Sequence, residues 1–392
     1  MRGPRRATWL FVLAVALAAV LSSLPRGALA FDRNFAGSAQ LDYHFAPTAK
    51  RARSFPDAFD GFTMELAGKV AVDFSDKVSA NLKVCYGCHG FEADMMYFDF
   101  RVADELNFRV GRFSPTFGAF NLRHDPANHR LSDKPLAYDM GRMLRMRQWN
   151  LGVMPSPFPD NGVEINGTRR LGAIAQLDYA VYAVSGFKAD AGALDLDFKL
   201  SRSPQSYYVD NNARPAGGAR VAVTLKLGDV SDLTLGASGM YGTFDPDNRL
   251  SYAIVGADAT LRLETTTVRV EGLSRRQEMD TSDPSRFKYV LSDKRGDFFM
   301  KHGAYVEVEQ AVTRELDLIA RADGLLRVGN VAADSELSSR ATVLRYTLGL
   351  AYAIERGLRV KFSTEAWDFG ERDALTNRKF ELGMHAALAG SF

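Results

Sequence analysis

Residues Met95–Val102 read MMYFDFRV, and this stretch decides the fold class. Its side chains and their neighbour form two alternating sets, with Met96, Phe98, Phe100 and Val102 on one side and Tyr97, Asp99, Arg101 and Ala103 on the other. Because successive side chains of a β-strand point to opposite faces, this pattern predicts a strand with one apolar face and one polar face.

The same period of two recurs along most of the chain. In the preceding segment Val78, Ala80, Leu82, Val84 and Tyr86 share a face opposite Ser79, Asn81, Lys83 and Cys85. Further segments read GARVAVTLKLG, DLTLGASGMYGTF, YAIVGADATLRL, TTTVRVEGLS, GAYVEVEQAV, RYTLGLAYAI, RGLRVKFSTEAWDF and FELGMHAALAGSF. Clusters of Gly, Asp, Asn, Pro and Ser separate the segments, so we expect about fifteen or sixteen strands.

Residues 1–30 have the composition of a secretory signal peptide. Three arginines within the first six residues precede an apolar run from Trp9 to Leu24, and residues 28–30 (ALA) supply a small-x-small cleavage site. The run is shorter than the roughly 20 residues that a spanning helix needs. We therefore expect a cleaved signal peptide over residues 1–30 and a mature chain that begins at Phe31.

The charge balance and the motif content exclude several classes of function. The whole chain carries 49 basic and 47 acidic residues, and without the four arginines of residues 1–30 its net charge is near −2. This balance gives no electrostatic reason to expect nucleic-acid binding. Charged residues interrupt every apolar run after residue 30, which excludes helical membrane spans. The sequence has no G-x-S-x-G, P-loop or H-E-x-x-H motif, and we expect no enzymatic activity.

Alternation alone fits both a soluble β-sandwich and a membrane barrel, but four features favour the barrel. The chain is predicted to be exported, and its strands are numerous. Short turns such as FSDK and ADEL alternate with long links such as Pro115–Arg147 and Asp190–Arg214, and Phe392 ends an alternating strand. We predict an all-β fold in which residues 31–392 form one domain, a transmembrane antiparallel β-barrel of about 16 strands in a bacterial outer membrane.

The stretch RVGRFSPTFGAF (Arg109–Phe120) resembles the phosphate-selective porin family, in which a strand carrying G-[RQ]-F runs into P-x-F-G. The resemblance is specific over about a dozen residues and implies a barrel of about sixteen strands with a long loop folded into the pore. It also implies a homotrimer in a lipid bilayer that passes small solutes. The lysine-rich loops through which those porins bind phosphate are not obvious here.

The long segment Pro115–Arg147 leaves the predicted outer end of a strand and is the candidate constriction loop. Together with charged residues on the inward faces of nearby strands it gives the predicted pore lining, which consists of Lys83, Asp99, Arg101, Arg109, Arg123, Arg130, Lys134, Arg142 and Arg145. Basic groups at a narrow point concentrate anions, which predicts a preference for anionic solutes. The alternative is that these charges only line a water-filled lumen and give no selectivity.

The two cysteines of the chain both fall in Cys85-Tyr86-Gly87-Cys88-His89. C-x-x-C-H is the attachment sequence of c-type haem, in which two thiols bond to one porphyrin and the adjacent imidazole binds the iron. We predict a covalent haem c on Cys85 and Cys88 with His89 as the proximal ligand. Two alternatives are a Cys85–Cys88 disulfide in a haem-free diffusion porin and half of a metal site, which lacks its second pair of soft ligands.

A haem at this position is expected at the outer mouth of the pore, because Cys85 shares the inward face of Lys83. His124 or His129 in the long loop is the predicted distal ligand, and Met140 and Met143 are further candidates. The haem would exchange electrons with a partner cytochrome. An outer-membrane enzyme or receptor is the third class of function to be tested.

Overall fold

The computed structural model describes residues 32–45, 61–87, 90–139, 152–189, 209–280, 282, 297–329, 342–370 and 379–391. The predicted signal peptide lies outside these residues, as do Cys88, His89, Met140, Arg142, Met143 and Arg145. No helix in this part of the chain combines the length and the apolar character that a membrane crossing requires.

Sixteen strands account for most of the described residues. In chain order they are β1 (Asp32–Phe45), β2 (Gly61–Ser75), β3 (Val78–Gly87), β4 (Gly90–Ala103), β5 (Leu106–Phe113), β6 (Asp160–Leu171), β7 (Ala175–Val184), β8 (Ala216–Lys226), β9 (Asp232–Thr243), β10 (Ser251–Arg262), β11 (Thr266–Glu278), β12 (Phe298–Ala311), β13 (Leu316–Gly329), β14 (Thr342–Glu355), β15 (Leu358–Phe369) and β16 (Phe380–Ser391).

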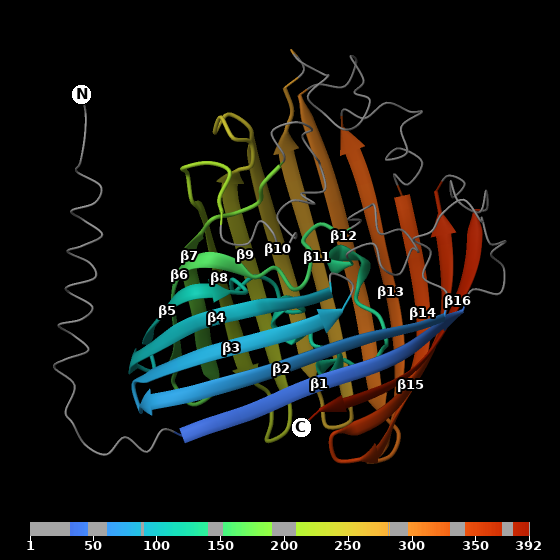
Figure 1. The fold of residues 1–392 in the computed structure, drawn as a ribbon. Coiled ribbons are helices and arrows are strands. Elements are labelled where there is room, and N and C mark those ends of the chain that lie inside the picture. Colours follow the sequence, from blue (N-terminus) through green and yellow to red (C-terminus); the bar gives the residue numbers. More distant parts are fainter. Residues whose placement is uncertain are drawn as a thin grey trace, which may run out of the picture.

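Each strand pairs antiparallel with its neighbours in the chain, and β1 pairs with β16 to close the barrel. Figure 1 shows this closure where the blue strand β1 meets the red strands at the end of the chain. The predicted all-β barrel of about sixteen strands is confirmed.

The connections differ between the two ends of the barrel, as the sequence predicted. Tight links of two to five residues join β2 to β3, β4 to β5 and the later pairs at one end. The longer links lie at the other end, called here the outer end, where residues 114–159 join β5 to β6 and residues 185–215 join β7 to β8. The link between β3 and β4 is the exception, because only residues 88 and 89 separate these strands.

The alternation of side chains in the sequence matches the two faces of the wall. In β14 the outward residues Leu344, Tyr346 and Leu348 are exposed, and Leu348 is 66% exposed, whereas Arg345 and Thr347 point inward and are buried. Exposed apolar side chains recur around the outside of the barrel. An apolar exterior with a charged interior is the pattern of a barrel that faces lipid, so the predicted faces are confirmed.

One irregularity in the pairing changes the interior near the cysteine motif. Lys83 pairs with Met95 and Val84 pairs with Ala93, which leaves Asp94 as the extra residue of a β-bulge. The alternation of the rest of β4 would place position 94 on the outward face, but the bulge turns this buried carboxylate toward Lys83. Bulges re-aim side chains in this way, and the sequence pattern does not reveal them.

Candidate functional site: the barrel interior

The segment between β5 and β6 folds back into the barrel, where Figure 1 shows its described part in green inside the wall. Residues 114–139 and 152–159, called here the inserted segment, contain three short 3-10 helices, η1 (Asn121–Arg123), η2 (Pro126–Asn128) and η3 (Leu136–Tyr138). The predicted long loop in the pore is confirmed, and it extends beyond Arg147 because β6 begins only at Asp160.

Apolar side chains of the inserted segment pack against the inner wall. Phe117, Phe120, Leu136, Tyr138 and Met154 are at most 1% exposed and share one apolar cluster with inward residues of the strands. The wall side of this cluster includes Tyr182, Met240, Ile254, Leu273, Phe299, Tyr305 and Trp367. Burial of a large apolar side chain contributes about 1.5–3 kcal/mol, so this packing holds the segment inside the barrel.

The carboxylate of Glu271 on β11 is the main polar anchor of the segment. It accepts hydrogen bonds from the backbone amides of Ala119 (2.8 Å) and Phe120 (3.1 Å) and from the hydroxyl groups of Tyr138 (2.5 Å) and Tyr305 (2.9 Å). Glu271 is buried, so these four donors replace the water that an ionised carboxylate requires.

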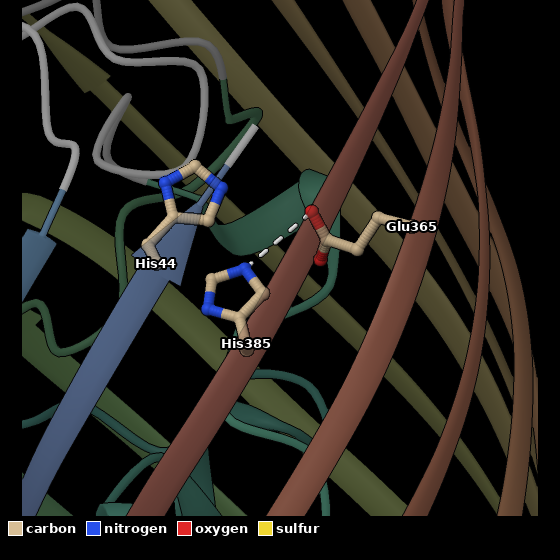
Figure 2. A group of neighbouring side chains, drawn as sticks. All are labelled: His44, Glu365 and His385. Carbon is tan, nitrogen blue, oxygen red and sulfur yellow. Dashed lines mark ion pairs between the residues drawn. The ribbon is translucent and has the colours of Figure 1, made fainter. Parts of the chain in front are cut away.

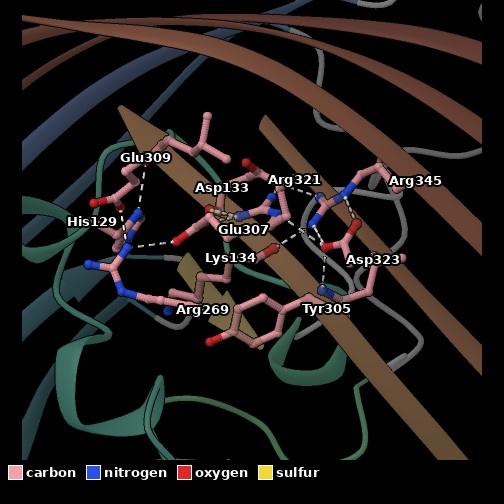
Figure 3. Close-up of polar contacts among 12 residues, drawn as sticks. His129, Asp133, Lys134, Arg269, Tyr305, Glu307, Glu309, Arg321, Asp323 and Arg345 are labelled. Carbon is pink, nitrogen blue, oxygen red and sulfur yellow. Dashed lines mark hydrogen bonds and ion pairs between the residues drawn. The ribbon is translucent and has the colours of Figure 1, made fainter. Parts of the chain in front are cut away.

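A second anchor is an ion-pair network between the segment and strands β13 and β14 (Figure 3). The carboxylate of Asp133 in the segment pairs with the guanidinium groups of Arg321 and Arg345. Asp323 pairs with Arg345 at 2.5 Å and accepts a hydrogen bond from the backbone amide of Leu136 at 2.9 Å. Buried charges need such partners, so the network fixes the position of residues 133–136 against the wall.

Polar contacts attach the inserted segment to nine strands around the circumference. The wall residues are Gln40 (β1), Lys83 (β3), Glu164 (β6), Ser238 (β9), Glu271 (β11), Glu307 (β12), Arg321 (β13), Arg345 (β14) and Lys361 (β15). The segment therefore crosses the lumen and is held on all sides.

Lys83, one of the predicted pore-lining residues, lies at a polar junction between β3, β4 and the segment. Its Nζ atom is 2.6 Å from Asp125 Oδ1, 3.3 Å from Asp94 Oδ2 and 3.0 Å from His124 Nε2. The other ring nitrogen of His124 donates to the carbonyl oxygen of Asn121 at 2.8 Å. Both nitrogens of His124 are thus occupied, and the lysine donates to a neutral imidazole.

Both histidines of the segment are buried in the neutral form. Burial, together with the adjacent positive charge of Lys83, lowers the pKa of His124 to about 4. Burial also lowers the pKa of His129, and the charges of Lys361 and Arg123 act in the same direction. The Nδ1 atom of His129 lies 2.8 Å from the carbonyl oxygen of Leu131.

The other predicted pore-lining residues within the described ranges lie on inward faces or on the inserted segment. Most of them are in ion pairs: Arg109 with Asp99 (2.8 Å) and Glu164 (3.4 Å), Arg101 with Asp73 (3.9 Å), Arg123 with Glu307 (3.1 Å) and Arg130 with Asp317 (2.8 Å). Lys134 donates to the carbonyl oxygen of Ser156 at 2.7 Å. Their carboxylate partners offset much of the positive charge on which the predicted anion preference rested.

Comparison with known proteins identifies the fold. No protein-family model and no curated protein matches the sequence. The anion-selective porin from Comamonas acidovorans aligns over 92% of this chain and 100% of its own, with a TM-score of 0.56 and 9% identity. The outer membrane channel DcaP of Acinetobacter baumannii aligns over 94% and 99%, with a TM-score of 0.55 and 12% identity. The fold is that of an outer-membrane porin. At these identities the likeness concerns the fold and carries no information about the solute.

OmpT, an outer membrane protein of Vibrio cholerae, has the same architecture. It aligns over 94% of this chain and 100% of its own, with a TM-score of 0.52 and 11% identity. Nearly the whole chain therefore aligns with porin folds.

The surroundings of Cys85 in this porin fold do not fit a haem. Its thiol faces the lumen, where Sγ lies 3.5 Å from the carboxylate of Asp94, which also pairs with Lys83. A haem macrocycle is a large apolar group, whereas these neighbours are charged. His124, the first distal candidate, has both ring nitrogens occupied. Cys88 and His89 lie outside the described residues, so haem attachment and the disulfide both stay predictions.

A row of three cations across β11, β12 and β13 was missed by the sequence analysis. Arg275 pairs directly with Lys301, and Lys301 pairs with Arg327. All three side chains are inward and buried near the outer end, and Arg275 also donates to the carbonyl oxygen of Val153 at 2.9 Å. Directly opposed residues lie about 5 Å apart, so the register sets three basic side chains next to one another. Alternation gave the face of each residue, but not the register that aligns them.

Proposed function

We propose that the protein is a porin of the bacterial outer membrane that passes small hydrophilic solutes. The observation that carries the proposal is the closed sixteen-strand barrel, apolar outside and charged inside, with an inserted segment fixed across its lumen. Such an exterior is stable in lipid, and a charged interior suits polar solutes. We further propose that the barrel assembles as a homotrimer in the bilayer, which size-exclusion chromatography with light scattering tests.

The solute class that we propose is small anions. Arg275, Lys301 and Arg327 lie side by side at the outer end, where solutes would enter. A set of like charges in a confined, low-dielectric space raises the local concentration of the opposite charge. The register of β11, β12 and β13 brings these three cations together, and this local grouping, not the total charge of the lumen, carries the expected preference.

Planar-bilayer recording tests both parts of the proposal. We expect discrete single-channel steps and a reversal potential in a KCl gradient with the sign of an anion-selective pore. Replacing Arg275, Lys301 and Arg327 together by Gln should lower the anion-to-cation permeability ratio several-fold. The matched control replaces three exposed cations at the opposite end, Lys226, Arg262 and Arg314, by Gln and should leave the ratio nearly unchanged.

Two results would contradict the proposal in different ways. A protein that forms no conducting steps is not a channel. A protein that conducts, but whose reversal potential is the same in the triple variant and in wild type, is a channel whose selectivity has another origin.

We propose that the channel works without haem, because the described neighbours of Cys85 are charged groups. The alternative, a covalent haem c on Cys85, Cys88 and His89 that exchanges electrons with a partner cytochrome, rests on the sequence motif. A haem-stained denaturing gel decides between them when the host has the c-type maturation system. We expect no stain. A stain that is lost in Cys85→Ala/Cys88→Ala would establish the haem instead.

A further inference from the structure

Three side chains converge at the seam where the barrel closes. His44 of β1, Glu365 of β15 and His385 of β16 point toward one another (Figure 2), and their ligand atoms all lie within 4.8 Å of one another. The register explains this meeting, because His44 pairs with His385 across β1 and β16, and Glu365 pairs with Gly383 across β15 and β16. All three side chains point into the barrel and are at most 5% exposed.

The ring of His385 is oriented by a carboxylate outside the cluster. Its Nδ1 atom lies 2.8 Å from Asp42 Oδ2, so Nδ1 carries the proton and Nε2 points into the cluster. Within the described residues this buried Nε2 has no hydrogen-bond partner. Metal-binding histidines almost always donate their second ring nitrogen to a carboxylate or carbonyl oxygen in this manner.

The spacing inside the cluster suits two ligands of one ion better than a hydrogen bond. His385 Nε2 and Glu365 Oε2 are 3.6 Å apart, which is too long for an N–H···O hydrogen bond. Two ligand atoms at about 2.0–2.1 Å from a tetrahedral zinc ion are separated by roughly 3.3 Å. A small movement of the two side chains toward each other would therefore give the separation expected of two zinc ligands.

The third ligand and the space for an ion are also provided. The rings of His44 and His385 are stacked with centroids 4.4 Å apart, an arrangement that two protonated rings would resist. A Cβ atom at Gly383 would lie 3.3 Å from Glu365 Oε2 and 3.4 Å from His44 Nε2. Glycine at this position therefore leaves open the space that the two ligand atoms face.

The carboxylate of Glu365 is held by its own partners. Trp367 Nε1 donates to Glu365 Oε2 at 2.9 Å, and Arg345 lies 3.4 Å from Glu365 Oε1. Hydrogen-bonded carboxylates of this kind are usual in metal sites.

We propose that His44, Glu365 and His385 bind one divalent transition-metal ion, such as Zn²⁺, and that Asp42 orients His385 for this purpose. Two imidazoles and one carboxylate are a ligand set that zinc and neighbouring metals accept. The ligands come from three adjacent strands on both sides of the β1–β16 junction. The bound ion would therefore cross-link β1 to β15 and β16, where the barrel closes.

The test uses the folded mature chain without an affinity tag, stripped with EDTA. Titration calorimetry with Zn²⁺ should give one ion per barrel, and Co²⁺ should give a visible absorption band that Zn²⁺ abolishes. His44→Asn and His385→Asn should weaken Zn²⁺ binding by more than 100-fold. Asp42→Asn should weaken it by about 10- to 100-fold, the usual effect of an outer partner. The matched control is His302→Asn, on the outward face of β12, which should bind as wild type.

Two further measurements keep the proposal falsifiable if a variant folds poorly. Gly383→Ala retains every ligand and fills the gap, so it should bind Zn²⁺ at least 10-fold more weakly. Saturating Zn²⁺ should raise the temperature at which the wild-type barrel unfolds in SDS, and His385→Asn should lose this shift. Absence of a stoichiometric site in wild type, or equal affinity in wild type and His385→Asn, would show that the cluster is an ion-pair network of Asp42, His385 and Glu365 only.

Discussion

His124 illustrates how a single side chain attaches the inserted segment to the wall. Its Nε2 atom accepts a hydrogen bond from Lys83 of β3, and its other nitrogen donates to Asn121 within the segment. This arrangement requires a neutral ring, because a protonated imidazole has no acceptor for the lysine and would repel it. The contact is therefore sensitive to acid.

We predict that the docking of the inserted segment weakens as the pH falls from about 6.5 to about 4. An undocked histidine is protonated below its ordinary pKa of about 6.5, whereas docked His124 stays neutral down to about 4. Its contribution is fully present above pH 6.5 and is lost across that window. The unfolding temperature of the wild-type barrel should fall accordingly. His124→Asn should start lower and show a shallower decline, and an identical decline in both proteins would contradict the prediction.

At the scale of the element, alternation predicted most strands, but it fades in β7, which packs against the inserted segment. In β7 the inward residues Tyr182 and Val184 are apolar because they pack against the segment, as Leu325 of β13 does. Both faces of β7 are therefore apolar over residues 180–184, and the period of two disappears there. In β13 the inward face keeps Arg321, Asp323 and Arg327, so the period of two survives in its sequence.

The candidate site residues also divide into those that the local sequence predicted and those that it did not. The prediction that Lys83, Cys85, Asp99 and Arg109 face inward was correct, because the face of a side chain depends only on its position in the alternation along its own strand. The Asp94 bulge, the row of three cations and the cluster of His44, Glu365 and His385 were missed. Each of these depends on the register between strands, which local sequence does not encode.

The outward face of β14 gives a direct test of lipid contact. Leu348 lies near the middle of this strand and is 66% exposed. We predict that Leu348→Arg destabilises the barrel in lipid vesicles by about 2–4 kcal/mol, since a charge near the bilayer midplane lacks solvation. Urea unfolding followed by tryptophan fluorescence measures this difference. Glu355→Arg, an exposed change at the end of the same strand, should have little effect, and equal effects of both would argue against a lipid-facing surface.

At the scale of the whole molecule, polar contacts hold the inserted segment across the lumen on nine strands, so in the proposed channel this segment narrows the path of a solute. We predict that replacing residues 116–157 by a short Gly-Ser linker raises single-channel conductance several-fold in the same bilayer assay. The shortened chain should also unfold at a lower temperature, because its apolar wall residues lose their partners. Unchanged conductance would mean that solutes take a path that the segment does not restrict.

The pairing of the first strand with the last has a consequence for how the chain folds. Asp42 and His385, which meet at the seam, are 343 positions apart in the sequence. Contacts between such distant residues form late, because loop closure has to precede them. Until β16 arrives, the growing sheet has two open edges whose backbone groups can pair with other chains. Aggregation during assembly is therefore the main hazard for this barrel, and loss of the final strand should leave an incomplete sheet rather than a smaller barrel.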